Sequence, residues 1–166
     1  MAPHCIDDPR RPTGGNVYDR RVCRGLAALG WSVNEHTVPG RWPRPDAQAR
    51  SAVAVVLARI PSGAMVLVDG LVASVVPEVL EPEAGRLRLV VLLHMPRDEP
   101  REVAALSAAS AIVATSEWTR RWLRDHYALP GTPVYVVPPG VDVAQLAAVT
   151  PSGGRLRCVA GVTPLK

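Results

Sequence analysis

Residues 86–116 read RLRLVVLLHMPRDEPREVAALSAASAIVATS and decide the predicted fold. An apolar run ending at a histidine (86–94) opens the segment, and a second run ending in Thr-Ser (110–116) closes it. Both are too continuously apolar for a sheet with one solvated face, and they suit parallel strands buried on both faces. Residues 98–110 place acidic side chains in the first turn of a helix, where the helix dipole favours them. The segment predicts a strand–helix–strand unit with parallel strands.

The same alternation continues on both sides of this unit. Further strands are expected within residues 1–8, 32–38, 64–70 and 133–140. Further helices are expected at 15–29, 46–59, 71–80 and 116–129. Alternation of this kind predicts the α/β class, with a Rossmann-like doubly wound parallel sheet.

The first predicted helix follows a Pro-Thr-Gly-Gly turn and ends at Gly30, which suits a left-handed C-cap. Its apolar residues share one side, which we expect to be buried; they are Val17, Val22, Leu26 and Leu29.

Composition narrows the class of protein. The chain has 166 residues, 48% of them hydrophobic, with no run of membrane-spanning length and no signal-peptide pattern, so a soluble, cytoplasmic protein is expected. Its three cysteines are distant from one another and predict neither disulfides nor a metal site. The net charge is +4, but arginines are scattered among acids, which argues against a nucleic-acid partner. A peripheral contact with the inner face of a membrane is the alternative use for these arginines.

Polar residues and glycines follow the predicted strands, at the points where they end. Because parallel strands end at one edge of a sheet, these residues are expected to meet there. They are Gly14, Gly15 and Asn16, then Asp69, His94 and Ser116.

Two readings of the glycine pair remain open. Gly14 and Gly15 let a backbone approach a ligand, and the helix N-terminus that follows suits a phosphate. The same residues also suit an ordinary turn into a helix, and no G-x-G-x-x-G motif is present. His94 either bonds a sugar hydroxyl or is satisfied by backbone at a strand end. No Ser–His–Asp set or metal-ligand spacing is visible.

Three segments together resemble family 4 glycosyltransferases. PTGGNVYDRRVCRGLAALGWSV (12–33) is similar to the family's glycine loop, first helix and second strand. AIVATSEWTRRWLRDHYALPGTPVYVVPPGVD (111–142) resembles its Thr-Ser helix and the strand that follows. CVAGVTPLK (158–166) resembles the start of its second Rossmann-like domain. The resemblance implies the N-terminal, acceptor-side half of a two-domain GT-B enzyme.

The resemblance implies retaining transfer of a hexose from a nucleotide-sugar, with no other cofactor and no metal. It assigns Gly14, Gly15 and Lys166 to the donor diphosphate and His94 to the sugar near the reacting carbon. The acceptor, a sugar or a lipid-linked sugar, is expected at Asn16, Asp69 and Ser116. The expected setting is bacterial carbohydrate biosynthesis. One departure is Gly161, which stands where the family usually has an arginine.

The expected organisation is an N-terminal domain (1–146), a linker (147–154) and the truncated first strand of a second domain (155–166). The chain would then need its missing C-terminal domain as a partner and be nearly inactive alone. A non-catalytic binding module with a degenerate GT-B half is the alternative. A nicotinamide-dependent dehydrogenase is a third reading, against which the missing G-x-G-x-x-G motif counts.

Overall fold

The computed structural model describes residues 1–3 and 13–143. Its centre is a four-stranded sheet in the order β3-β4-β5-β6, in which every neighbouring pair is parallel. The strands are β3 (Met65–Asp69), β4 (Arg88–Leu93), β5 (Ala111–Ala114) and β6 (Val134–Val136).

Two short strands extend this layer past β3. β1 (Ala2–Pro3) pairs in parallel with β2 (Thr37–Val38). Met1, immediately before β1, donates to the carbonyl of Leu67 (2.5 Å) and accepts from the amide of Asp69 (3.0 Å). These bonds place β1 beside β3, so the strands follow one another as β2-β1-β3-β4-β5-β6. The order reverses between β1 and β3, which is where ligands bind in doubly wound sheets.

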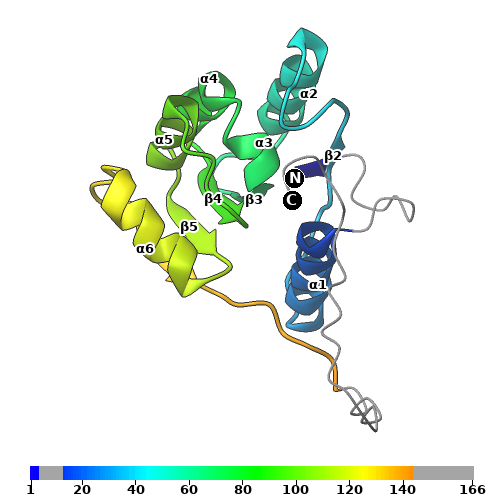
Figure 1. Ribbon diagram of the computed structural model, residues 1–166. Coiled ribbons are helices and arrows are strands. Elements are labelled where there is room, and N and C mark those ends of the chain that lie inside the picture. Colours follow the sequence, from blue (N-terminus) through cyan, green and yellow to red (C-terminus); the bar gives the residue numbers. More distant parts are fainter. Residues whose placement is uncertain (4–12, 144–166) are drawn as a thin grey trace, which may run out of the picture.

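Helices connect successive strands (Figure 1). They are α1 (Gly14–Ala28), α2 (Ala47–Ala58), α3 (Gly70–Ala73), α4 (Pro77–Leu80), α5 (Pro100–Ser107) and α6 (Glu117–His126), with a 3₁₀ turn at Glu81–Glu83 after α4. Right-handed crossovers place α1, which leads back from β1 to β2, on one face of the sheet and the later helices on the other. Figure 1 shows α2, α4 and α5 grouped together and α1 standing apart.

The hydrophobic core lies under the later helices. Val68 and Val91 of the sheet, Leu57 of α2, Leu106 of α5 and Leu123 of α6 are fully buried members of one cluster. None of the described residues in that cluster belongs to α1.

The predicted α/β class with a Rossmann-like parallel sheet is confirmed. Two helical details were wrong. Residues 71–80 form two short helices, α3 and α4, because the chain turns at Ser74–Val76 between them. The expected apolar face of α1 is also wrong, since Val17 and Leu29 are 50% and 78% exposed, while Asp19 is buried in their place. The predicted linker, the start of a second domain, and Lys166 lie outside the described residues.

Helix termini follow the signals in the sequence. The side chains of Thr13, Asp46 and Ser116 accept from backbone N–H groups of α1, α2 and α6 respectively. At the other end of α1, Gly30 has φ +88°, and the amides of Gly30 and Trp31 donate to Ala27 and Leu26 in a Schellman motif. The caps fix where α1 begins beside the sheet.

Gly70 gives a test of the packing between α3 and β4. A Cβ added there would lie 3.1 Å from the Leu92 carbonyl oxygen and 3.0 Å from a Leu93 methyl carbon. We expect Gly70→Ala to lower the free energy of unfolding by about 1–3 kcal/mol, because backbone must move. Gly25→Ala is the control, since its Cβ meets nothing within 4 Å and gains about 1 kcal/mol of helix propensity. Urea denaturation of both variants measures the contrast, and equal stability would contradict the close packing.

Candidate functional site

The N-terminal turns of α1 lie against the end of β4. His94 directly follows β4, and Gly15 is in the first turn of α1. A Cβ on Gly15 would lie 3.3 Å from Cδ2 of His94 and 3.4 Å from its Nε2. A side chain at position 15 would crowd the imidazole ring, which would have to shift by a few tenths of an ångström. Gly14, with nothing within 4 Å, has no such contact. The expected meeting of the glycine loop and the histidine at one edge is confirmed.

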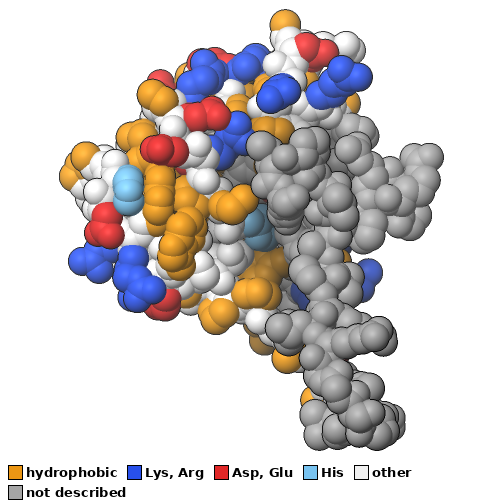
Figure 2. Space-filling model, in the orientation of Figure 1, with side chains coloured by type: hydrophobic (Ala, Val, Ile, Leu, Met, Phe, Trp, Pro, Cys, Tyr) orange, Lys and Arg blue, Asp and Glu red, His pale blue; other side chains and the backbone are white. Residues whose placement is uncertain are grey.

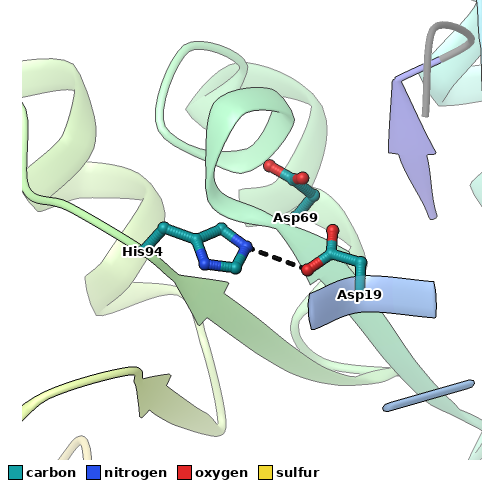
Figure 3. Close-up of side chains that lie close together, drawn as sticks. All are labelled: Asp19, Asp69 and His94. Atoms are coloured by element: carbon teal, nitrogen blue, oxygen red, sulfur yellow. Dashed lines mark hydrogen bonds and ion pairs between the residues drawn. The ribbon is translucent and has the colours of Figure 1, made fainter. Parts of the chain in front are cut away.

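Two more residues of α1 hold the same ring. Nε2 of His94 lies 2.9 Å from Oδ1 of Asp19, a contact drawn in Figure 3. The ring of Tyr18 packs edge-on against the imidazole, with centroids 5.5 Å apart. Gly15, Tyr18 and Asp19 are spaced i, i+3, i+4, so they share one face of the helix. That face is the one α1 turns toward the sheet.

Asp69 completes a buried cluster. It ends β3 and caps α3, accepting from the amide of Leu71 at 2.5 Å. Asp19 and Asp69 are 5% and 4% exposed, whereas the His94 side chain is 25% exposed. One ligand atom from each of the three lies within 4.8 Å of the others. Figure 3 shows both carboxyl groups on the same side of the imidazole ring.

Burial and mutual proximity determine the protonation of the cluster. Burial, together with a hydrogen bond to Asp19 and the charge of that residue, raises the pKa of Asp69 to about 7. Burial alone would lower the pKa of His94, but the bond to Asp19 and the charges of Asp19 and Asp69 raise it above its ordinary value. A neutral Asp69 can donate its proton to Asp19, and the negative charge that remains on the pair favours the protonated imidazole of His94.

These groups can also be compared with a metal site. Two carboxylates and an imidazole at this spacing are donors that a divalent cation accepts. In the structure Asp19 and His94 already bond to each other, and the raised pKa of Asp69 favours its neutral form beside them. The arrangement is suited to holding protons in place.

A groove lies behind the carboxyl pair. It has a volume of about 700 Å³ and is lined by α1, residues 31–37 and β3. Asp19 and Asp69 line it, but His94 does not. The carboxyl pair thus separates this groove from the exposed edge of His94, and the groove lies next to the cluster rather than at the imidazole.

The end of β6 also reaches α1. The Tyr18 hydroxyl donates to the carbonyl of Val137 at 2.7 Å. Arg21 forms a bidentate ion pair with Asp142. Both side chains are exposed, so solvent screens this pair. These contacts bring residues 137–142 to the rim that carries His94.

A second buried carboxylate fixes the loop after His94. Glu102 in α5 is completely buried and accepts from the Ser74 hydroxyl (2.6 Å), the Arg97 amide (2.7 Å) and the Tyr127 hydroxyl (2.7 Å). Three donors to one buried carboxylate compensate for its lost hydration. The β4–α5 loop is thereby tied to α3, α5 and α6.

The predicted site residues fall into two groups. Gly15, His94 and Asp69 are brought together, and Asn16 is buried beside them on α1. Ser116 caps α6 through its bond from the Thr119 amide (3.1 Å), while the neighbouring Thr115 hydroxyl donates to the His94 carbonyl (3.3 Å). The assigned roles of Gly14, Gly15, Asn16, Asp69, His94 and Ser116 stay predictions, and Lys166 lies outside the described residues.

Sequence reasoning missed Tyr18 and Asp19. An acid in the middle of an Arg-rich helix suggests a solvated face, and the apolar residues of α1 drew attention to another face. The available signal was the spacing, since Gly15, Tyr18 and Asp19 repeat at i, i+3 and i+4.

Comparison with known proteins finds a family match for part of the chain. Residues 84–145, which include β4 to β6, His94 and Ser116, match the family described as Glycosyltransferase Family 4. The resemblance drawn from the sequence is confirmed over this segment, which covers less than half of the chain. Gly15, Asp19 and Asp69 lie outside it. No curated protein and no solved structure matches the chain.

Asp69 gives a test of the shared proton. Its raised pKa means that the folded state holds an extra proton between about pH 4 and pH 7, so the wild-type chain loses stability as pH rises through that window. Asparagine can still accept from Leu71 and donate to Asp19. We expect the stability of Asp69→Asn, relative to wild type, to rise by about 2–3 kcal/mol between pH 5 and pH 8.

Urea denaturation at the two pH values measures this difference. Asp46→Asn is the matched control, because it replaces an exposed carboxylate that also caps a helix. A pH-independent difference between Asp69→Asn and wild type would show that Asp69 ionises as an ordinary carboxylate.

Proposed function

We propose that this chain, whose residues 84–145 belong to the family 4 glycosyltransferases, acts in retaining transfer of a hexose from a nucleotide-sugar. The chain would supply the acceptor-side domain of a GT-B enzyme and face a second lobe that contributes to donor binding. The contact between Gly15 and His94 is the observation that carries this proposal.

The N-terminus of α1 suits the donor diphosphate. No partner among the described residues accepts from the N–H groups of Gly14 and Gly15, and α1 has no acidic residue in its first turn to oppose an anion. A phosphate here would meet free amides and the positive end of the helix dipole. The absent side chain at Gly15 lets the ligand and the imidazole share this edge.

His94 would meet the sugar beside the diphosphate. Its ring is partly exposed. The raised pKa of His94 favours the protonated imidazole, which would place a positive charge next to the anion. Cationic and N–H groups that neutralise the departing diphosphate stabilise the developing charge of the transition state. We include Lys166 in this role, as the resemblance implies, and no other cofactor or metal.

The acceptor side is built from the same rim. Ser116 and Thr115 end β5 next to His94, so an acceptor sugar would approach between them and the loop fixed by Glu102. Asp69 is buried, and its influence on an acceptor would pass through Asp19. Asn16 is also almost buried, so only its outer edge is available to an acceptor.

The surroundings of the site bear on the proposed partners. Among the described residues, no helix has the length and apolar character needed to cross a membrane. On the face drawn in Figure 2, basic side chains form separate groups with acidic side chains beside them and an apolar strip between. That distribution supports a sugar-based acceptor, lipid-linked where the apolar strip contacts a membrane surface, rather than a nucleic acid.

His94 gives the test of this function. The assay joins the chain at its carboxyl end to a family 4 second lobe and measures release of nucleoside diphosphate from a panel of uridine, guanosine and adenosine diphosphate hexoses. We expect His94→Ala to lower turnover by about 100-fold or more, as loss of a charge-stabilising donor does.

His126→Ala is the matched control, since His126 stacks on Trp122 at the far end of α6. Equal turnover of His94→Ala and the parent protein would remove His94 from the reaction. Binding of nicotinamide cofactors, but of no nucleotide-sugar, would replace the proposal with the dehydrogenase reading.

A further inference from the structure

Three residues of α1 contact the His94 ring. Gly15 lies against its Cδ2–Nε2 edge, Tyr18 packs edge-on at 5.5 Å, and Asp19 binds Nε2 at 2.9 Å. Together these contacts hold the ring against the first turns of α1. The helix therefore helps to set the position of the imidazole.

The two ring nitrogens differ in their surroundings. Nε2 is engaged by the buried carboxylate of Asp19, so it must carry a proton to make that bond. Nδ1 has no hydrogen-bond partner among the described residues, and Figure 3 shows it on the side of the ring away from Asp19. Nδ1 is the nitrogen that remains for a ligand.

The charges around the ring favour one protonation state. Tyr18 and Asp19 face it from α1, and Asp69 faces it from the end of β3. Behind the carboxyl pair lie the Met1 amino group and Cys23. Because Asp19 is 5% exposed, water screens its charge poorly, and the imidazole lies 2.9 Å from its carboxylate.

We propose that Asp19 is a positioning residue that fixes the proton of His94 on Nε2 and turns Nδ1 toward an oxygen atom of the bound sugar or diphosphate. This inference rests on the proposed function for the identity of the ligand. The ligand group would be a hydrogen-bond acceptor while His94 is charged, and Asp69 would hold Asp19 in place by donating its proton to it.

The decisive experiment observes His94 directly. The chain is labelled with nitrogen-15 histidine, and the shifts of both ring nitrogens are followed by NMR from pH 5 to pH 9. We expect the wild-type ring, once neutral, to keep its proton on Nε2. In Asp19→Asn the midpoint of the His94 titration is expected to fall, because the negative charge is gone.

Two further variants separate position from folding. Asp19→Ala removes both the charge and the acceptor, so the neutral ring is expected to populate both tautomers. Glu35→Gln is the matched control, because Glu35 is an exposed carboxylate paired with Arg20 of the same helix, and its loss should leave the His94 signals unchanged. If Asp19→Ala does not fold, the near-isosteric Asp19→Asn still decides the question.

A second measurement connects the inference to turnover. In the assay with the second lobe, we expect Asp19→Asn to lower turnover by about 10–100-fold. The falling limb of the pH profile should move to lower pH together with the His94 midpoint. Rescue of turnover by lowering the pH would be the signature of lost charge, which a merely structural defect would not give.

Several results would overturn the proposal. They are an unchanged His94 titration in folded Asp19→Asn, a neutral wild-type ring protonated on Nδ1, or unchanged turnover and pH profile in that variant. Stoichiometric perturbation of the three side chains by Mg²⁺ or Mn²⁺ would instead make the cluster a cation site. Absence of turnover from every protein, wild type included, would count against the proposed function alone, since the NMR titration decides the role of Asp19 independently.

Discussion

The contact between Asp19 and His94 is the constraint on which the site depends. The topology leaves α1 separate from the later helices, and no described residue of the main hydrophobic cluster belongs to α1. Its buried residues are Asn16, Tyr18 and Asp19, all polar or partly polar. Among the ion pairs that α1 makes with described residues, Asp19–His94 is the most buried, whereas Arg20 and Arg21 pair with the exposed carboxylates of Glu35 and Asp142, which stabilises little. The buried contacts of α1 with the ends of the strands are thus polar, through His94 after β4 and through the Tyr18–Val137 hydrogen bond after β6.

Two buried carboxylates, those of Asp19 and Glu102, hold the segments on either side of the end of β4. Asp19 joins α1 to the end of β4, and Glu102 joins α5 to the loop that follows β4. Glu102 is satisfied by neutral donors alone, from Ser74, Arg97 and Tyr127. Burial and the Glu102 hydrogen bond raise the pKa of Tyr127, so its hydroxyl stays a donor. The Glu102 network therefore relies on neutral donors, whereas the other cluster contains Asp69 and His94, whose pKa values are both raised.

The features that could be predicted from the sequence are those that depend on a repeated pattern of apolar residues or on a single local residue. Apolar runs such as 86–94 and 110–116 predicted parallel strands because burial on both faces leaves no polar alternation. Caps at Asp46, Ser116 and Gly30 were visible because each depends on one side chain or one backbone angle. The meeting of Gly15 and His94 followed from topology, since parallel strands end at one edge.

What could not be predicted depends on contacts between distant segments. The burial of Asp19 is determined by residues 50 and 75 positions away, Asp69 and His94, and helix periodicity alone favours burial of Val17 and Leu29 instead. The division of 71–80 into α3 and α4 occurs where the chain turns at Ser74–Val76, which is invisible in a continuous apolar run. Both errors have the same cause, because periodicity reports which residues can share a face and not which partner the fold provides.

The cluster of Asp19, Asp69 and His94 lies where the strand order reverses, between β1 and β3. β1 and β3 diverge there, so α1 and α3 start on opposite faces of the sheet and leave a gap that neither helix fills. In this structure Asp69 caps α3 on one side of that gap, and Asp19 reaches into it from α1 on the other. A proton shared between them relieves the repulsion that two buried carboxylates would otherwise have. The charges of the same pair raise the pKa of His94, and its ring keeps an exposed edge, so the contact that joins α1 to the sheet also favours the protonated imidazole that our proposal requires.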